Sequence, residues 1–446
     1  MRERSDRVPT FSEEPAAQLL VRSSADRTMP QASRQNNERP NGRGHSQPTG
    51  RPQAESSARD GFDSARTSPV ETGKRMRCPS CHLGSSPHDS TDGCPMLDVK
   101  GRDMATLAMQ FREALSRIEP KNDAKHAATA HQQVSDALRA DELLKRLEVD
   151  PKLIGSYGRE VSIRRVKDVD VFARLWGADE RIRPGAILDH VTDVLDKAFP
   201  GLASRQHRSV KVDFPDFDLS VDVVIARPCI HHPREHWQIP QQIDQNGQAS
   251  WIETNPLKMG ELTTAHNKRF LLNPDDETTG IYVPIVKLVR QIRRTWVDQQ
   301  PGGYYFEVLT FHAFQQLDPH ERTVAHYLTP VLGHIAAQLT GLEQQGPLDP
   351  TMAGKRITTK ATPTQVRAAA ERMRRASELA AEALALEDVC RSAVAWQQLF
   401  GETQGTRRPE TVFPLPDRCN PDGTTKSASG ITRGAPAVPA GDDRYA

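Results

Sequence analysis

Apolar side chains are spread very unevenly along this chain, and their distribution limits where a folded core can form. Residues 1–103 contain two aromatic residues, Phe11 and Phe62, in a background rich in Arg, Ser, Pro, Gln, Asn and Asp. Residues 415–446 have a similar composition. Such segments bury too little apolar surface to offset the entropy lost on folding, so we predict that both are disordered tails. The folded part is therefore expected at 104–414.

The two tails account for a hydrophobic content of 36%, which is low for a globular chain. Once they are set aside, the remaining body is long enough for one large core or for two joined lobes. Met104 is also a candidate start of translation. Two interpretations of residues 1–103 therefore stay open, a natural tail and an extension that the cell does not translate.

Charge, hydropathy and cysteine content exclude several classes of protein. The 446 residues include 59 Lys and Arg against 58 Asp and Glu, so we expect no basic coat dedicated to duplex nucleic acid. No segment has roughly 18 consecutive apolar residues, so no membrane span is predicted. The N-terminus lacks the pattern of a signal peptide. Six cysteines are too few for a disulfide framework in so long a chain, and a cytoplasmic protein with reduced thiols is expected.

One short segment of the N-terminal tail has a partial spacing of metal ligands. Cys78, Cys81 and Cys94 occur there with two histidines between them. Three thiolates and an imidazole could complete a tetrahedral zinc site. The second close pair of ligands found in many zinc sites is missing, and the surrounding composition is that of a disordered segment. Two interpretations stay open, a weak Cys/His zinc knuckle at 78–94 and a tail without metal.

Periodicity divides the body into two parts. Before about residue 250, short β-rich runs alternate with helical spacing, and after it helical spacing dominates. We therefore predict an α+β fold with two lobes, a first lobe with a mixed β-sheet over 104–250 and a helical lobe over 251–414. The predicted strands cover 169–175, 208–212 and 219–226. The predicted helices cover 104–118, 124–147, 184–199, 283–296 and 364–400.

A set of carboxylates in the first part points to chemistry. Asp168 and Asp170 are two residues apart in a β-rich run, so their side chains project from the same face of a strand. Asp222 lies in a second strand among valines, where an acid needs a partner or a metal ion. Three carboxylates converging from neighbouring strands would make an oxygen-rich site that suits Mg²⁺. Gly155 and Ser156, at the end of an earlier apolar run, would offer N–H groups and a hydroxyl to phosphate.

The Gly-Ser pair and the aspartates are a specific signal only when they occur together. A Gly-Ser pair is common, and two aspartates two residues apart occur on many exposed strands and turns. The combination of both with a third aspartate in a V-D-V-V strand is much rarer. Asp216 and Asp218 are nearby rivals to Asp222. If Asp222 is in register, Asp218 lies on the same face but nearer to solvent.

With these residues in view, the body resembles the nucleotidyltransferase superfamily that includes DNA polymerase β, CCA-adding enzymes and oligoadenylate synthases. The resemblance lies in GSYGREVSIRRVKDVDVF and LSVDVVIA. Within the superfamily, the chain is most similar to the bacterial CD-NTases, the cyclic-GMP-AMP-synthase-like and dinucleotide-cyclase-like enzymes of anti-phage signalling. Three further segments look like the family's opening helix, its basic helix and its closing segment: MATLAMQFREALSRIEP, VPIVKLVRQIRRTW and AVAWQQLFGETQGTRRPETVFP. The resemblance covers about 104–414.

The resemblance implies a role for each matching residue. Gly155 and Ser156 match the family's turn, where the serine contacts the phosphates of the donor nucleotide. Asp168 and Asp170 match its metal-binding pair. Asp222 matches the third acid, which in the family also binds metal and helps activate the attacking hydroxyl.

Three basic residues are implied less specifically. Arg159 follows the Gly-Ser turn, and it either touches phosphate or holds the turn. Lys287 and Arg290 are three residues apart on the predicted helix 283–296, so they are expected to lie near one another. For Lys287 the resemblance implies triphosphate binding, and the alternative is a solvated helix face.

The implied activity is in-line nucleotidyl transfer from ATP and other NTPs, which gives a cyclic or linear oligonucleotide second messenger. Two Mg²⁺ ions about 3.5–4 Å apart would be held by the three aspartates, with Mn²⁺ as a substitute. An activating regulatory protein is a further partner to expect. Two alternatives stay open: transfer of a nucleotide to RNA, protein or a small molecule, and a catalytically silent regulatory protein on the same fold.

Overall fold

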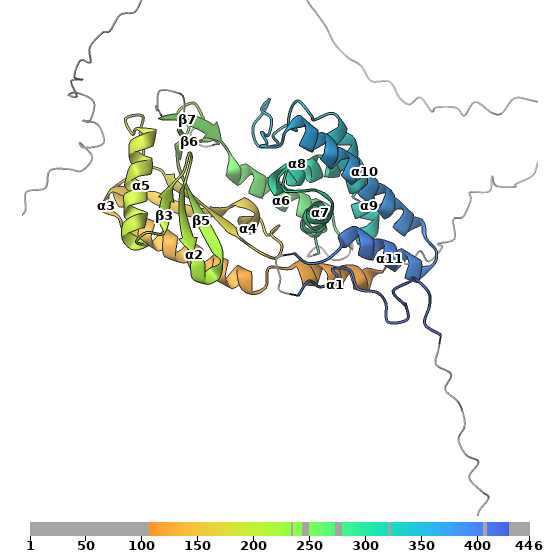
Figure 1. The fold of residues 1–446 in the computed structure, drawn as a ribbon. Coiled ribbons are helices and arrows are strands. Elements are labelled where there is room, and N and C mark those ends of the chain that lie inside the picture. Colours follow the sequence, from red (N-terminus) through yellow and green to blue (C-terminus); the bar gives the residue numbers. More distant parts are fainter. Residues whose placement is uncertain are drawn as a thin grey trace, which may run out of the picture. The chain divides into compact units, whose positions relative to one another are not determined.

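The computed structural model describes residues 107–427 without 233–234, 243–248, 273–278, 320–322 and 405–407. All of them belong to one unit of the chain, and they form the predicted α+β fold (Figure 1). A sheet with its own apolar core makes the first lobe, and a helical core makes the second. The predicted zinc knuckle at 78–94 lies outside the described residues.

The first lobe is built on a seven-stranded sheet within the described residues. Its strands run in the order β1-β2-β5-β4-β3, with β6 paired to β5 and β7 paired to β6. Neighbouring strands β2 and β5 are parallel, and the other described pairs are antiparallel. The strands are β1 (Val149–Ile154), β2 (Asp168–Leu175), β3 (Ala203–Arg205), β4 (Val210–Phe214), β5 (Leu219–Pro228), β6 (Trp237–Gln242) and β7 (Ala249–Thr254).

The second lobe is built around α8, whose sequence GYYFEVLTFHAF is buried on almost all sides. A helix that is apolar all round belongs inside a core. Helices α7 and α9 pack against it, and α10 and α11 pack against them. The helices are α1 (Ala108–Ile118), α2 (Asn122–Ala140), α3 (Glu142–Arg146), α4 (Gly155–Gly158), α5 (Pro184–Ala198), α6 (Pro256–Arg269), α7 (Tyr282–Trp296), α8 (Gly303–Phe314), α9 (Val324–Thr340), α10 (Pro363–Ala385) and α11 (Val389–Phe400), with a 3₁₀ turn η2 (Pro215–Phe217).

Alternation along β2 and β5 gives the central strands one buried face and one face toward the site. The valines on the first face are fully buried against α2 and α5. Because successive strand residues point to opposite sides, the aspartates between these valines face away from that core. The buried valines are Val169, Val171, Val221 and Val223.

Helix α1 precedes the sheet in the sequence but packs with the helical lobe. The ring of Phe111 meets those of Trp396 and Phe413 edge-on, each at a centroid distance of 5.0 Å. The first and last described helices therefore lie together, as Figure 1 shows for α1 and α11.

Two long predicted helices are each divided in the structure. The predicted helix 124–147 becomes α2 and α3, because Asp141 is extended and its carboxylate accepts a hydrogen bond from Leu144 N–H at 2.9 Å. The predicted helix 364–400 becomes α10 and α11. There Asp388 caps α11 by accepting hydrogen bonds from the N–H groups of its first turn. Short side chains that bond to the backbone in this way favour helix starts.

The chain beyond residue 414 corrects two predictions. The structure describes residues 415–427, so the folded part extends past the predicted boundary at 414. A disulfide joins Cys390 at the start of α11 to Cys419, and both cysteines are buried. Their wide separation in the sequence carried no signal of pairing, so the expectation of reduced thiols throughout was wrong for these two.

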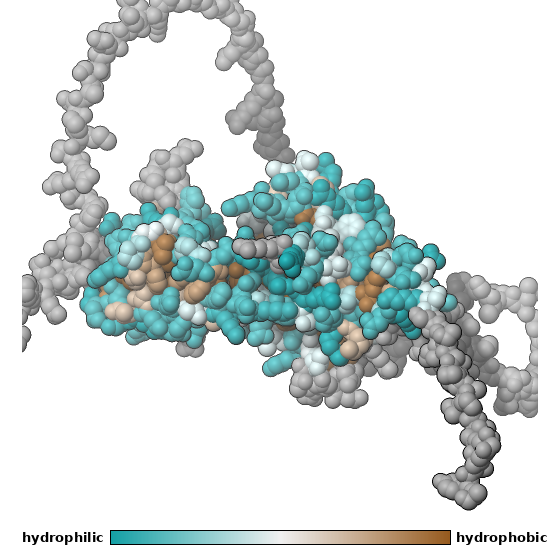
Figure 2. Space-filling view, turned by 60° about the horizontal axis from the view of Figure 1, so that its bottom comes forward, coloured by the Kyte–Doolittle hydropathy of each residue, from teal (hydrophilic) through white to brown (hydrophobic). Residues whose placement is uncertain are grey.

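The face in Figure 2 is largely hydrophilic, with small hydrophobic patches between hydrophilic groups. Among the described helices, none is both long enough and apolar enough to cross a membrane.

Candidate active site

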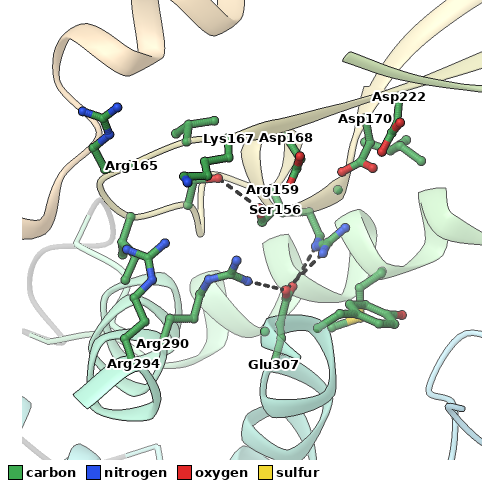
Figure 3. Close-up of a pocket in the computed structure, with 18 of the residues that line it drawn as sticks. Ser156, Arg159, Arg165, Lys167, Asp168, Asp170, Asp222, Arg290, Arg294 and Glu307 are labelled. Atoms are coloured by element: carbon green, nitrogen blue, oxygen red, sulfur yellow. Dashed lines mark hydrogen bonds and ion pairs between the residues drawn. The ribbon is translucent and has the colours of Figure 1, made fainter. Parts of the chain in front are cut away.

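The three predicted aspartates meet where β2 and β5 run side by side. Asp170 pairs with Asp222 in the parallel register, and Asp168 pairs with Ser220. The hydroxyl of Ser220 donates a hydrogen bond to Asp168 Oδ1 at 3.2 Å. Figure 3 shows the three carboxylates above one pocket. Two neighbouring strands therefore bring together acids that are about fifty residues apart in the sequence.

The electrostatics of these acids favour a bound cation. Burial raises the pKa of Asp170, and the charge of Asp168 adds to this effect, although Arg159 opposes it. Burial, followed by the charges of Asp170 and Asp168, raises the pKa of Asp222 to about 6. Asp222 Oδ1 is buried and has no hydrogen-bond partner among the described residues. Buried polar atoms are normally satisfied, so this oxygen marks a place for a ligand.

The Gly-Ser turn lies directly against this acidic pair. Strand β1 ends at Ile154, and Gly155 follows with φ +69°, a left-handed conformation that favours glycine. A Cβ at this position would lie 1.8 Å from Asp170 Oδ2. Ser162 Oγ donates to Ser156 Oγ at 3.1 Å, which leaves the proton of the Ser156 hydroxyl for another partner. Glycine thus permits the turn to approach the carboxylate.

The pocket has a volume of about 810 Å³ and is lined by both lobes. Such a volume suits a ligand of nucleotide size. Its acidic side is formed by the aspartates of β2 and β5, and Tyr304 of α8 also lines it. Five basic residues also line it: Arg159, Arg165, Lys167, Arg290 and Arg294. Acidic and basic groups facing one cavity can hold a cation together with polyphosphate.

The structure brings most predicted site residues to this pocket. Besides the three aspartates, Gly155, Ser156, Arg159 and Arg290 line it. Lys287 does not. Its Nζ pairs with Glu119 Oε1 at 2.6 Å, and its side chain lines a second cavity of about 560 Å³. The rival Asp218 is exposed and pairs with Arg165.

Sequence reasoning missed several residues of the pocket wall. Glu307 is the most buried of them, and its carboxylate accepts two hydrogen bonds from Arg159. A signal was present, because Glu307 is the single acid in the otherwise apolar helix α8. A buried acid needs a partner, but nothing in the sequence identified Arg159 as that partner. Arg294, Arg165 and Lys167 carried no signal beyond their charge.

Mg²⁺ fits this donor set in kind. Carboxylates are its usual protein ligands, and Asp222 Oδ1 offers a buried oxygen without a partner. In their present arrangement, no group of three or more His, Cys, Asp or Glu side chains among the described residues could hold a metal ion. The structure therefore supplies the ligand chemistry at this site but not a closed metal cage.

Comparison with known proteins finds a family whose model matches the part of the chain that carries the aspartates. The match to a family model covers residues 104–267, which include the Gly-Ser turn and all three aspartates. The matching family is described as Second Messenger Oligonucleotide or Dinucleotide Synthetase domain. The predicted resemblance to CD-NTases is thereby confirmed, and so is the predicted enzyme class, a nucleotidyltransferase.

Two curated relatives extend this similarity beyond the domain. A cyclic AMP-AMP-AMP synthase from an Acinetobacter species is 26% identical over 310 residues, which are 66% of this chain and 84% of the relative. A cyclic AMP-AMP-GMP synthase from Enterobacter hormaechei subsp. hoffmannii is 25% identical over 398 residues. That alignment covers 76% of this chain and 100% of the relative.

A solved structure supports the fold. The Bradyrhizobium diazoefficiens CD-NTase CdnG in complex with GTP has a TM-score of 0.51 and 17% sequence identity to this chain. The alignment covers 66% of this chain and 96% of CdnG. At this level of identity the similarity shows the fold alone.

Proposed function

We propose that this synthetase is a Mg²⁺-dependent enzyme that joins ATP and other NTPs into a cyclic oligonucleotide. The observation that carries the proposal is the meeting of Asp168, Asp170 and Asp222 with the Gly155–Ser156 turn in one pocket. The names of both curated relatives, which are cyclic trinucleotide synthases that use AMP units, support ATP as a substrate and a cyclic product. The GTP bound to CdnG supports a second purine nucleotide.

Each side chain has a task in this reaction. Asp168, Asp170 and Asp222 would hold Mg²⁺, which would supply charge neutralisation at the α-phosphate and lower the pKa of the attacking ribose hydroxyl. Ser156 donates its hydroxyl to the donor phosphates. Arg290 and Arg294 face the polyphosphate from α7 and stabilise its negative charge.

The chemistry is a substitution at phosphorus. The ribose oxygen forms a bond to the α-phosphorus of the donor, and the bond from that phosphorus to pyrophosphate breaks. The ribose hydroxyl loses its proton, and we assign Asp222 to its removal. Positioning and electrostatics are expected to supply most of the rate, as in other phosphoryl and nucleotidyl transfers.

We further propose that the product is a second messenger in anti-phage signalling and that the enzyme works in the cytoplasm, where its NTP substrates are found. An activating regulatory protein belongs to this proposal on the sequence resemblance alone. A neighbouring gene for a nuclease or membrane protein that responds to the product would support the signalling role.

The proposal is tested with the purified chain, Mg²⁺ and a mixture of the four NTPs. We expect a phosphatase-resistant oligonucleotide whose mass corresponds to a closed ring. Changing Asp168→Ala together with Asp170→Ala removes two metal ligands and should lower product formation by at least about 1000-fold, the scale of a lost electrostatic element. Asp216→Ala is the matched control, since this aspartate is exposed on η2 and does not line the pocket. Equal activity of the parent and the double variant would refute the site.

A further inference from the structure

A buried carboxylate joins the two lobes at the wall of the pocket. Glu307 lies on α8 in the helical lobe, and its side chain is 0% exposed. Arg159 comes from the other lobe, directly after the Gly-Ser turn. It donates Nε–H to Glu307 Oε1 at 2.7 Å and Nη2–H to Oε2 at 3.0 Å. This bidentate geometry is the most directional contact that an arginine makes with a carboxylate.

A second arginine shares the same carboxylate. Arg290 of α7 places Nη1 3.5 Å from Glu307 Oε2. Its guanidinium lies against Gly303, where a Cβ would be 3.1 Å from Arg290 Nη2. Figure 3 shows both arginines pointing toward Glu307 at the edge of the pocket. One acid therefore fixes two cations that come from different elements.

The charge of this cluster is unusual for a purely structural contact. Two guanidinium groups and one carboxylate leave one net positive charge, and Asp170 is the nearby acid that acts on both arginines. A buried ion cluster is often no more stabilising than apolar side chains of the same volume. Apolar side chains, however, could not orient Arg290 toward the pocket, and they could not hold the Gly-Ser turn at a fixed distance from α8.

We propose that Glu307 is a positioning residue for nucleotidyl transfer. Through Arg159 it fixes the turn that carries Ser156, and through Arg290 it fixes a cation of the facing helix. It acts through the two arginines and is not assigned any contact with substrate. This inference rests on the proposed function, because it assumes that phosphate binds between that turn and that helix.

Steady-state kinetics on three folded variants test the inference. Glu307→Gln removes the charge and keeps the shape. Glu307→Asp keeps the charge but shortens the side chain, so it remains informative if the first variant does not fold. Asp150→Asn is the matched control, because it breaks a part-buried ion pair with Arg174 at the other end of β1 and β2. Thermal unfolding is recorded for each variant, and rates are measured well below its melting temperature.

We expect each Glu307 variant to raise KM for the NTPs at least about tenfold and to lower kcat by a smaller factor, since a misplacement of about 1 Å can cost about 100-fold. Asp150→Asn should lower the melting temperature without changing KM. If a folded Glu307 variant has the KM and kcat of an active parent, Glu307 is structural and the inference is wrong. A parent that forms no product overturns the proposed function and this inference together.

Discussion

At Asp222 the sheet holds a carboxylate in surroundings that favour its neutral form. Its partner on β2 is the acid Asp170, and its partner on β4 is Lys211. One oxygen has no hydrogen-bond partner among the described residues, and burial, followed by the charges of Asp170 and Asp168, raises its pKa to about 6. A cation would reverse this preference by favouring the charged form. Without a bound cation, the site therefore favours the uptake of a proton or a metal ion.

The raised pKa of Asp222 predicts that the stability of the fold depends on pH. The folded pKa of Asp222 lies above its usual value of 3.8, so its stabilising contribution is complete below about pH 4 and is lost as the pH rises through about 6. Asp222→Asn cannot titrate. Without Mg²⁺ it should melt about 2–4 °C above the parent at pH 7.5, with a smaller difference at pH 5.

Calorimetry of the two proteins at both pH values checks this prediction. Added Mg²⁺ should raise the melting temperature of the parent and have little effect on Asp222→Asn. A difference between parent and variant that is the same at pH 5 and pH 7.5 would contradict the assignment of the raised pKa to this residue.

The turn between β1 and α4 illustrates how one element depends on a residue of another. Gly155 has a left-handed φ and lies against Asp170, and Gly201 has a similar φ of +74° with no atom within 4 Å of a Cβ at its position. Both glycines lack the strain that another residue would have in this conformation, about 1–2 kcal/mol. A Cβ added at Gly155 would also displace the carboxylate of Asp170, whereas a Cβ added at Gly201 would meet no atom.

Gly155→Ala and Gly201→Ala therefore form a matched pair. Both should lose about 1–2 kcal/mol in the free energy of unfolding from backbone strain. Gly155→Ala should lose more than its partner, because its methyl group must push Asp170 aside, and its activity should fall at least about 100-fold. Denaturant unfolding and product assays measure both effects. Comparable activity of the two variants would show that the close approach to Asp170 does not matter.

The elements also show what the sequence could predict and what it could not. Asp168, Asp170 and Asp222 were expected to converge because strand alternation is a local rule and two short β-rich runs tend to pair. Lys287 and Arg290 were expected together for a similar local reason, their spacing on one helix. In the structure Lys287 turns to Glu119 and Arg290 turns to Glu307. The partner of each is set by tertiary packing, which cannot be predicted from the spacing of residues on one helix.

For the whole molecule, the least predictable feature was the disulfide. Cys390 and Cys419 are 29 residues apart, and the segment that carries Cys419 had the composition of a tail. Closing a loop of this length restricts the unfolded chain and is worth about 3–4 kcal/mol. The described segment 415–427 is thereby joined to α11 on the helical lobe, and none of its residues lines the pocket.

Cys419→Ser should lower the free energy of unfolding by about 3–4 kcal/mol and leave KM and kcat at 25 °C unchanged. Denaturant titration without reductant measures the loss. A reductant should destabilise the parent by the same amount and should not affect the variant. Reactive thiols are then counted in the unfolded parent, once without reductant and once after reduction. Equal counts would show that the bond between Cys390 and Cys419 is not formed.

The packing of Phe111 against Trp396 and Phe413 has a consequence for synthesis of the chain. A ribosome makes α1 first, yet its partners emerge nearly three hundred residues later. Until then α7, which carries Arg290, lacks its contacts with α11. A chain that ends before α11 thus has its aspartates but an incomplete helical lobe, and we expect nucleotidyl transfer only from the finished polypeptide.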